Sequence, residues 1–468
     1  MSNIPVKDVT PKTQSMYEKR TKIYVREILG VFQRLRTYTL WALMLSYYGA
    51  VWLNWEGRQA IYFDLPARQF HIFGVTFWPQ DFMLLSWALI ISAFALFTVT
   101  NLAGRLWCGY TCPQSAWSFL FMWVEEKAEG TRNQRIKLDK EPMSATKLRK
   151  KAIKHTGWIF IAFMTGLTFV GYFSPIRELV PSFFQFEVGG WAAFWIGMFT
   201  VGTYVNAGWM REQVCIYMCP YARFQSVMYD SDTLAVSYDV NRGEPRGKRS
   251  KKAKEETDTN QLGDCVDCSL CVQVCPTGID IRDGMQYQCI GCALCIDACD
   301  SIMDKLNKPR GLVRYTTENE LEGQKTHFMR PRLIGYAVVL TAMISAFSYA
   351  MITRTPFELD IERDRSSLYQ RTVNDTIQNA YTLKMMNMSQ HPHTYELRVE
   401  GQEGLSMDVT HLYDIKVNEM KEISLNLELN PEETKLTSSK VNIEFVIIDT
   451  KTGEEIAREE SRFIAPRS

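Results

Sequence analysis

Histidine is scarce in this chain of 468 residues, and none lies within an uncharged run long enough to cross a membrane. The six are His71, His155, His327, His391, His393 and His411. A transmembrane b-type haem needs axial histidines that face one another across the helices, and the sequence offers no such pair. His155 and His327 flank apolar runs, and we interpret them as interfacial side chains rather than metal ligands.

Cysteine is missing from the last third of the chain, because all twelve cysteines lie between Cys108 and Cys299. This absence excludes a disulfide framework in the segment that we place outside the membrane below. It favours metal or redox chemistry in a reducing compartment. The net charge is only +1, which argues neither for nor against a nucleic-acid partner.

Eight of the cysteines fall in residues 265–299 as two tandem copies of the spacing Cys-x2-Cys-x2-Cys-x3-Cys. This is the run of a bacterial two-cluster ferredoxin, in which the fourth cysteine of each copy ligates the other cluster. We therefore predict two 4Fe–4S clusters, the first held by Cys265, Cys268, Cys271 and Cys299 and the second by Cys289, Cys292, Cys295 and Cys275. Zinc knuckles are disfavoured because eight cysteines in this register exceed a zinc site. Asp300 stands where the second copy usually has proline, a departure that removes no ligand but bears on the turn beside the first cluster.

Five uncharged runs are each long enough to cross a hydrocarbon core of about 30 Å. They are residues 37–55, 82–103, 156–176, 188–210 and 333–353. The first is too long, and too far from the amino terminus, to be a cleaved signal peptide. The sequence therefore predicts five transmembrane helices.

Lysine and arginine gather in alternate connections between these runs, as the positive-inside rule requires. Residues 1–36 and the second and fourth connections are basic, whereas 56–81 and 177–187 carry few positive charges. We predict a bacterial inner-membrane protein with a cytoplasmic amino terminus. The predicted parts are the amino-terminal segment 1–36, membrane helices 1–4 in 37–240, a flexible charged linker 241–262, the ferredoxin module 263–332, a fifth helix 333–353 and an outer domain 354–468.

The remaining four cysteines form two motifs of the spacing Cys-x3-Cys-Pro, and they are Cys108, Cys112, Cys215 and Cys219. Each motif follows the second or fourth run, so the first four helices look like a two-fold repeat, an arrangement that commonly places a shared site at its interface. The spacing puts both thiols on one helical face, or else proline starts a helix whose amino-terminal end holds the second cysteine. Four thiolates suit Cu(I), zinc or another iron–sulfur cluster, and a pair suits linear Cu(I) or a dithiol–disulfide couple. Arg105 and Arg211 could favour thiolate, although we interpret them as interfacial arginines.

The segment after the fifth run alternates apolar and polar residues over short stretches. Examples are 381–386, 395–399, 423–427 and 441–446. Such spacing predicts a small antiparallel immunoglobulin-like sandwich, here without a disulfide. Methionines and histidines cluster in it and include copper-ligand types, but we interpret them as structural because they fall in a strand and its turn; they are Met385, Met386, Met388, His391 and His393.

This order of parts resembles the CcoG/FixG/RdxA family of cytochrome c oxidase accessory proteins over nearly the whole chain. The resemblance implies a role in assembling a cbb-type oxidase, with reduction of Cu(II) to Cu(I) for its copper centre. Copper would then be handled at Cys108, Cys112, Cys215 and Cys219, which become the predicted catalytic and metal-binding residues. The expected partners are membrane lipid, a cytoplasmic electron donor, oxidase subunits or a copper chaperone, and a second copy of the chain, with no nucleic acid.

Two other functions remain open at this point. The membrane part also resembles the quinol-dehydrogenase-type polyferredoxins of nitrate and nitrous-oxide respiration, which share the Cys-x3-Cys-Pro element. Such a protein would need a quinone pocket near the membrane surface. A non-enzymatic copper-insertion scaffold is disfavoured because two clusters imply electron flow.

Overall fold

The computed structural model describes residues 22–247, 262–355, 357–372, 375–389, 391–409, 411–417, 419–430 and 439–466. Most of the predicted amino-terminal segment and of the charged linker lies outside these residues. The chain divides into two compact units, Met1–Leu53 with Ala88–Ala342 and Asn54–Trp87 with Met343–Ser468. Each unit is described by itself.

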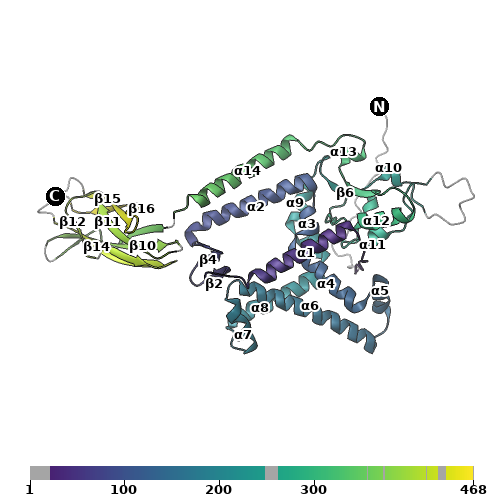
Figure 1. The fold of residues 1–468 in the computed structure, drawn as a ribbon, viewed down its shortest axis with the longest axis horizontal. Coiled ribbons are helices and arrows are strands. Elements are labelled where there is room, and N and C mark those ends of the chain that lie inside the picture. The colour runs from purple at the N-terminus through teal and green to yellow at the C-terminus, as the bar shows by residue number, and fades with distance from the viewer. Residues whose placement is uncertain are drawn as a thin grey trace, which may run out of the picture. The chain divides into compact units, whose positions relative to one another are not determined.

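The helices of the first unit form a bundle in which α6 packs against both α4 and α8 (Figure 1). Its longer helices are α1 (Val31–Ala50), α2 (Phe82–Ala103), α4 (Pro113–Glu129), α5 (Arg132–Lys140), α6 (Ala145–Gly171), α7 (Ile176–Phe184), α8 (Gly190–Thr203) and α9 (Pro220–Met228). Gly166 sits where α6 and α8 meet, and a Cβ there would lie 2.7 Å from the carbonyl oxygen of Ile196. A small residue at this point lets the two helix backbones approach closely.

Three helices among the described residues are long and apolar enough to cross a membrane. They are Pro79–Ala103, Ala145–Gly171 and Pro331–Ile352, the last being α14. Helix α1 falls short in apolar character because its first turns carry Gln33, Arg34 and Arg36. Helix α8 has 14 residues and continues as a π-helix over Tyr204–Met210. The structure thus supports three of the five predicted spans by length and composition.

Helix α6 begins eleven residues before the predicted third span and includes its basic block. Lys151 and Lys154 each lie 2.9 Å from Glu129, whose side chain is fully buried. These ion pairs stabilise the first turns of α6, so the helix extends beyond the predicted apolar span. Two lysines of the basic block, Lys151 and Lys154, therefore pair with a buried carboxylate of the folded unit.

The ferredoxin module begins earlier than the sequence indicates. Strand β6 (Ala235–Tyr238) pairs antiparallel with β7 (Val313–Thr316), so residues assigned to the membrane domain close the module. The start of the predicted linker is folded as well, because Arg242 in α10 (Val240–Gly243) holds Asp264 at 2.7 Å. The other short helices of this unit are α3 (Leu106–Tyr110), α11 (Leu270–Gln273), α12 (Leu294–Lys305) and α13 (Glu318–Leu321).

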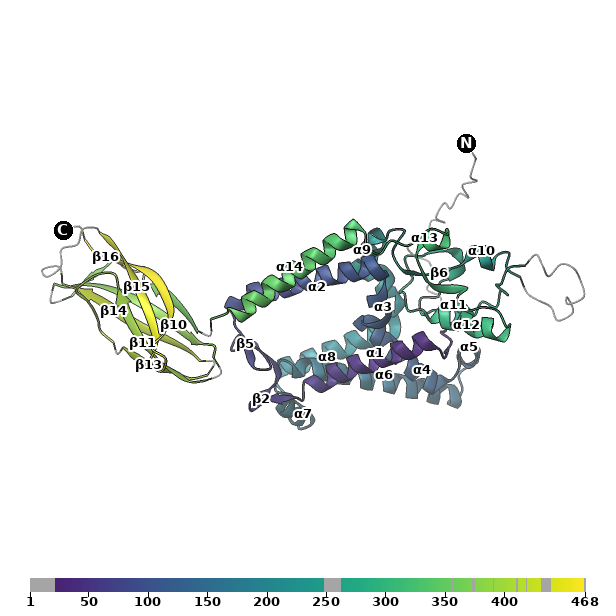
Figure 2. The same ribbon diagram turned by 45° about the horizontal axis from the view of Figure 1, so that its top comes forward.

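The carboxy-terminal domain is a two-sheet sandwich, as the alternating pattern predicts (Figure 2). One sheet has the order β12-β14-β10-β8 with β9 beside β10, and the other β13-β11-β15-β16. The bounds are β8 (Phe357–Arg363), β9 (Gln370–Arg371), β10 (Ile377–Asn387), β11 (His393–Glu400), β12 (Leu405–Met407), β13 (Leu412–Ile415), β14 (Met420–Leu429), β15 (Lys440–Asp449) and β16 (Glu455–Ile464). Every second residue of β10 points into one hydrophobic core, which includes Tyr381, Leu383 and Met385.

The first connection belongs to the same unit as the sandwich. It contains β1 (Asn54–Trp55), β2 (Arg58–Gln59) and the meander β3 (Ile61–Asp64), β4 (Gln69–Ile72) and β5 (Val75–Phe77). Arg354, just after α14, makes an ion pair of 2.5 Å with Asp81 at the end of this connection. The end of this connection therefore contacts the segment that follows α14 within the second unit.

Candidate metal centres

The eight ferredoxin cysteines surround two small cavities, each of about 20 Å³. One cavity is lined by Cys265, Cys268, Cys271 and Cys299 and the other by Cys275, Cys289, Cys292 and Cys295, with Cys271 also reaching it. All eight thiols are free of disulfides. Four thiols around each cavity are the donor set of a 4Fe–4S cluster, so these residues fit the predicted group.

The two copies of the run have the same unusual backbone. The second and fourth residues after the first cysteine of each copy have positive φ; they are Asp267 and Ser269 in one copy and Gly291 and Ala293 in the other. Non-glycine residues adopt this region at a cost of about 1–2 kcal/mol. Turns of this kind aim backbone N–H groups into a concavity that favours anions, and the Gly291 N–H lies 3.5 Å from the Cys289 sulfur.

Asp300 permits a longer helix in the second copy than proline allows in the first. Helix α11 ends at Gln273, just before Cys275 and Pro276, whereas α12 runs through Cys299 and Asp300 to Lys305. The Asp300 carboxylate accepts a 3.0 Å hydrogen bond from the Gly311 N–H. Asp300, which replaces the usual proline, thus connects α12 to the segment just before β7.

The two Cys-x3-Cys-Pro motifs have matching geometry. In each, the first cysteine lies in a one-turn helical segment, α3 or the π-helix Val214–Met218, and the second is the N-cap of the next helix with proline at the first position. Of the two local geometries that the spacing allows, the structure shows the second, because Cys112 and Cys219 are extended residues at the start of the next helix and do not share a helix with the first cysteine. Proline starts α4 and α9 because its missing N–H is not needed there.

The four thiols of these motifs lie within electrostatic reach of one another. Burial raises the pKa of Cys108 to about 12, the charges of the other three thiols add to this, and Arg105 opposes it. Burial likewise raises the pKa of Cys215 to about 12. The metal-free thiols of Cys108 and Cys215 are therefore protonated at neutral pH, and a metal that binds them must displace their protons.

No three or more His, Cys, Asp or Glu side chains in the described part of the chain are close enough to hold a single metal ion. The four motif thiols are nonetheless close enough to influence one another electrostatically. Soft thiolates suit Cu(I), and the pair within one motif is the smallest donor set that the chain offers to it.

Helix α3 places Cys108 against the residues that line the second cluster cavity, which are called here the shell of that cavity. Cys108 packs against the buried group that contains Ile290 and Cys292. A Cβ on Gly109 would lie 2.8 Å from the carbonyl oxygen of Gly291 and 3.0 Å from the Cα of Cys292, so only glycine fits. Tyr110 donates a 3.4 Å hydrogen bond to the Cys292 carbonyl oxygen.

The second motif approaches the same cavity from another direction. Cys215 lines a small void of about 30 Å³ together with Pro276, Thr277 and Ile290. Pro276 follows Cys275, which belongs to the second cluster cavity. Both motifs therefore adjoin the cysteines that surround one of the two cavities.

Arg105 and Arg211 are buried, and the interpretation of them as interfacial arginines is wrong. Arg105 is 5% exposed and donates to the carbonyl oxygen of Ala222, while Arg211 is 8% exposed and lies 2.6 Å from Glu125. Each arginine holds the segment beside a motif in place. Their burial follows from partners more than 80 residues away, which the sequence does not reveal.

The histidines outside the motifs have partners of their own. His155, which lies inside α6, shares a 2.8 Å hydrogen bond with Tyr204, and His327 lies 3.8 Å from Asp232. In the sandwich, Met385 and Met386 are fully buried, and His393 bonds to Asp449 at 2.6 Å. These contacts agree with a structural role.

Sequence reasoning missed several side chains that shape the centres, including Gln225, which accepts the 3.6 Å hydrogen bond from Cys108. It also missed Gln33 and Arg36, which lie just before the first apolar run and belong to the same helix, α1. The one feature of the sequence that could have pointed to them is that polar side chains lie at the edge of a predicted span.

Two family profiles match separate segments of the chain, and whole-length relatives match most of it. A family profile for a 4Fe–4S dicluster domain matches residues 210–318, and one for the IG-like fold at the C-terminal of FixG matches residues 347–466. The chain is 37% identical to the nitrogen fixation protein FixG of Rhizobium meliloti, over 84% of this chain and 82% of that protein. It is also 37% identical to protein RdxA of Cereibacter sphaeroides, over 84% and 85% of the two chains. A crystal structure of a FixG-related protein from Vibrio parahaemolyticus is 29% identical, covers 24% of this chain and 97% of that one, and gives a TM-score of 0.22.

Proposed function

Because the chain belongs to the FixG/RdxA family of iron–sulfur membrane proteins with a redox role, we propose that it reduces Cu(II) to Cu(I) for assembly of a cbb-type oxidase. The reacting copper would bind at Cys108, Cys112, Cys215 and Cys219. Copper is the substrate here, whereas the clusters would be resident cofactors.

The residues that would hold the clusters are the two sets of four cysteines around the two cavities. When bound, the clusters would supply reversible one-electron storage. The observation that carries the proposal is the contact of Cys108 with the shell of the second cavity, through the glycine pair Gly109 and Gly291. A metal at the motif would thus lie beside a one-electron store.

The thiols themselves favour the product of the reaction. Reduction of Cu(II) takes one electron, and soft sulfur ligands stabilise Cu(I) over Cu(II). Arg105, whose charge acts on Cys108 and on Cys215, would help to offset the negative charge of bound thiolates.

The same proposal includes five membrane crossings with a cytoplasmic ferredoxin module. The Lys and Arg pattern supports it, as does the ion pair of Arg354 with Asp81, which joins two segments assigned to the outer side. The outer sandwich would then be free to dock an oxidase subunit or a copper chaperone.

The test is the iron, sulfide and copper content of anaerobically purified protein, with wild type compared to a variant in which the four motif cysteines are alanine. We expect about eight iron atoms per chain in both proteins and copper in wild type only. Reduced wild-type protein should then convert Cu(II) to Cu(I), measured with a Cu(I)-specific chelator. Loss of iron from the variant would show a further cluster at the motifs, and copper binding without reduction would show a scaffold.

A further inference from the structure

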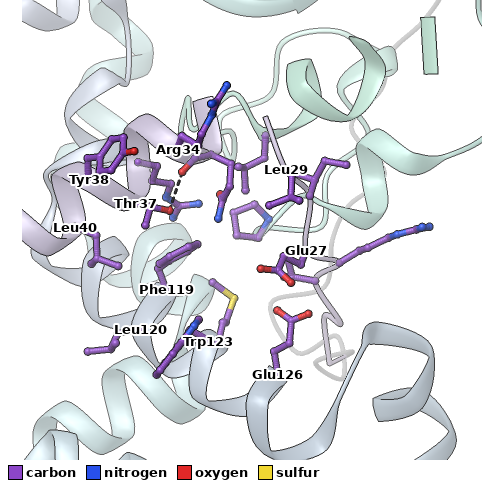
Figure 3. A pocket seen from close by; sticks show the side chains of 18 of the residues that line it. Glu27, Leu29, Arg34, Thr37, Tyr38, Leu40, Phe119, Leu120, Trp123 and Glu126 are labelled. Atoms are coloured by element: carbon purple, nitrogen blue, oxygen red, sulfur yellow. Dashed lines mark hydrogen bonds between the residues drawn. The ribbon is translucent and has the colours of Figure 1, made fainter. Parts of the chain in front are cut away.

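A cavity of about 350 Å³ lies between α1 and α4, beside the ferredoxin module (Figure 3). This volume is within the range of pockets that bind small molecules. Its wall is mostly apolar and aromatic, with Tyr38, Phe119 and Trp123 around it. Tyr38 and Trp123 are also largely exposed, as aromatic side chains at a membrane–water interface often are.

Two polar atoms in this wall are buried without a partner among the described residues. Arg36 is 4% exposed, and its Nη1 has no hydrogen-bond acceptor, although its guanidinium stacks 4.7 Å from the Phe119 ring. The Oε1 of Gln33 is buried and has no donor. An unpaired polar atom in a buried position is destabilising, so a ligand that forms hydrogen bonds with both atoms would be favoured.

The cavity also contains a pair of carboxylates. Figure 3 shows Glu27 and Glu126 facing each other at one end. Burial and the neighbouring charge of Glu27 raise the pKa of Glu126 above its usual value. A carboxylate of this kind is a better proton acceptor than an exposed one.

One wall of this larger cavity is formed by residues next to the cysteines of the second cluster cavity. Pro276 and Leu294 line the cavity, and each is the chain neighbour of a cysteine in that shell, Cys275 or Cys295. The charge of Arg36 also acts on Cys292. An occupant would lie against the same cysteine shell that Cys108 contacts.

A phospholipid chain has nothing to offer the two unpaired polar atoms. A flat aromatic ring with an oxygen at each end can stack on aromatic side chains, donate to Gln33 and accept from Arg36. We propose that this cavity binds the ring of a lipid-soluble hydroquinone, which is the electron donor of the protein. This inference rests on the proposed function, because it names the donor for the same copper reduction.

The chemistry balances with copper as the terminal acceptor. One hydroquinone loses two O–H bonds, two electrons and two protons and becomes a quinone with two C=O bonds. The cysteines around the two small cavities would hold the clusters, which when bound would accept these electrons one at a time, and the two electrons would finally convert two Cu(II) to two Cu(I). The two protons would pass to Glu126 and then to Glu27. Because the Glu27 side chain is exposed, it can release them to solvent.

Decylubiquinone binding to the full chain in detergent tests the site without copper. We expect saturable quenching of tryptophan fluorescence, because Trp41 and Trp123 line the cavity. Gln33→Leu and Arg36→Met should each weaken binding at least tenfold. Gln324→Leu, which changes an exposed glutamine outside the cavity, should bind as wild type does.

A second readout is the reduction of the clusters by decylubiquinol, followed by electron paramagnetic resonance. Wild type and Gln324→Leu should be reduced, and the two cavity variants should be reduced at least tenfold more slowly, although dithionite reduces all four. The inference is overturned if quenching does not saturate, if phosphatidylcholine displaces the quinone equally well, or if Gln33→Leu behaves as wild type. Quinone binding by a protein that fails to reduce copper would overturn the proposed function alone.

Discussion

Glu125 is a carboxylate with no exposed surface, and three cations surround it. Arg211 lies at 2.6 Å, Lys22 at 3.3 Å and Arg135 at 3.6 Å. Burial by itself would raise its pKa, but these charges outweigh burial and lower the pKa to about 2. Removal of one partner of a buried ion pair typically costs about 3–5 kcal/mol, because the other charge is left unpaired.

The pH dependence of stability follows from this shift. The pKa of Glu125 in the folded protein lies below the usual glutamate value of 4.5, so the stabilisation is complete above about pH 4.5 and is lost as pH falls toward 2. We expect Glu125→Gln to be less stable than wild type at pH 7 and to lose less stability over that acid range. Thermal unfolding in detergent at several pH values measures this, with exposed Glu141→Gln as the control. Parallel pH curves for wild type and Glu125→Gln would contradict the assignment.

At the scale of elements, the contact of α3 with the ferredoxin loop depends on the absence of a side chain at Gly109. The atoms that an added Cβ would meet are backbone atoms of Gly291 and Cys292, which cannot rotate away. Overpacking of this kind costs about 1–3 kcal/mol. We expect Gly109→Ala to lower the unfolding temperature by several degrees and to slow copper reduction.

Gly202→Ala is the matched control for this change. Gly202 also lies in a helix, α8, but an added Cβ there would meet nothing within 4 Å. Its unfolding temperature should be unchanged or slightly higher, because alanine is the better helix former. Equal effects of the two substitutions would mean that the α3 contact does not hold the module.

At the scale of the whole molecule, the sandwich offers a direct test of sidedness, because residues 354–468 contain no cysteine. Glu454→Cys places one thiol on an exposed turn between β15 and β16. A membrane-impermeant maleimide should label this variant in intact spheroplasts. Wild type should be labelled only after lysis, and labelling of Glu454→Cys only after lysis would reverse the proposed orientation.

Local patterns in the sequence were enough to predict the elements and the types of ligand. Cysteine spacing predicts two clusters because three thiols separated by two residues can wrap one cube, and alternation predicts the sandwich because strands repeat every two residues. The apolar runs predict helices, although α1 and α8 show that a run marks a helix better than a membrane span. Asp300 extends α12 rather than merely altering a turn, since the loss of proline restores a helical N–H.

Which residues can hold metal follows from the amino-acid sequence, since ligand identity and spacing are local properties of the chain. Which side chains lie beside these metal-binding residues is visible only in the folded structure. The approach of Gly109 to Gly291, of Arg211 to Glu125 and of Arg36 to the cluster loop joins segments 86 or more residues apart. Such contacts depend on how buried surfaces fit together, and no periodicity along the chain encodes that fit.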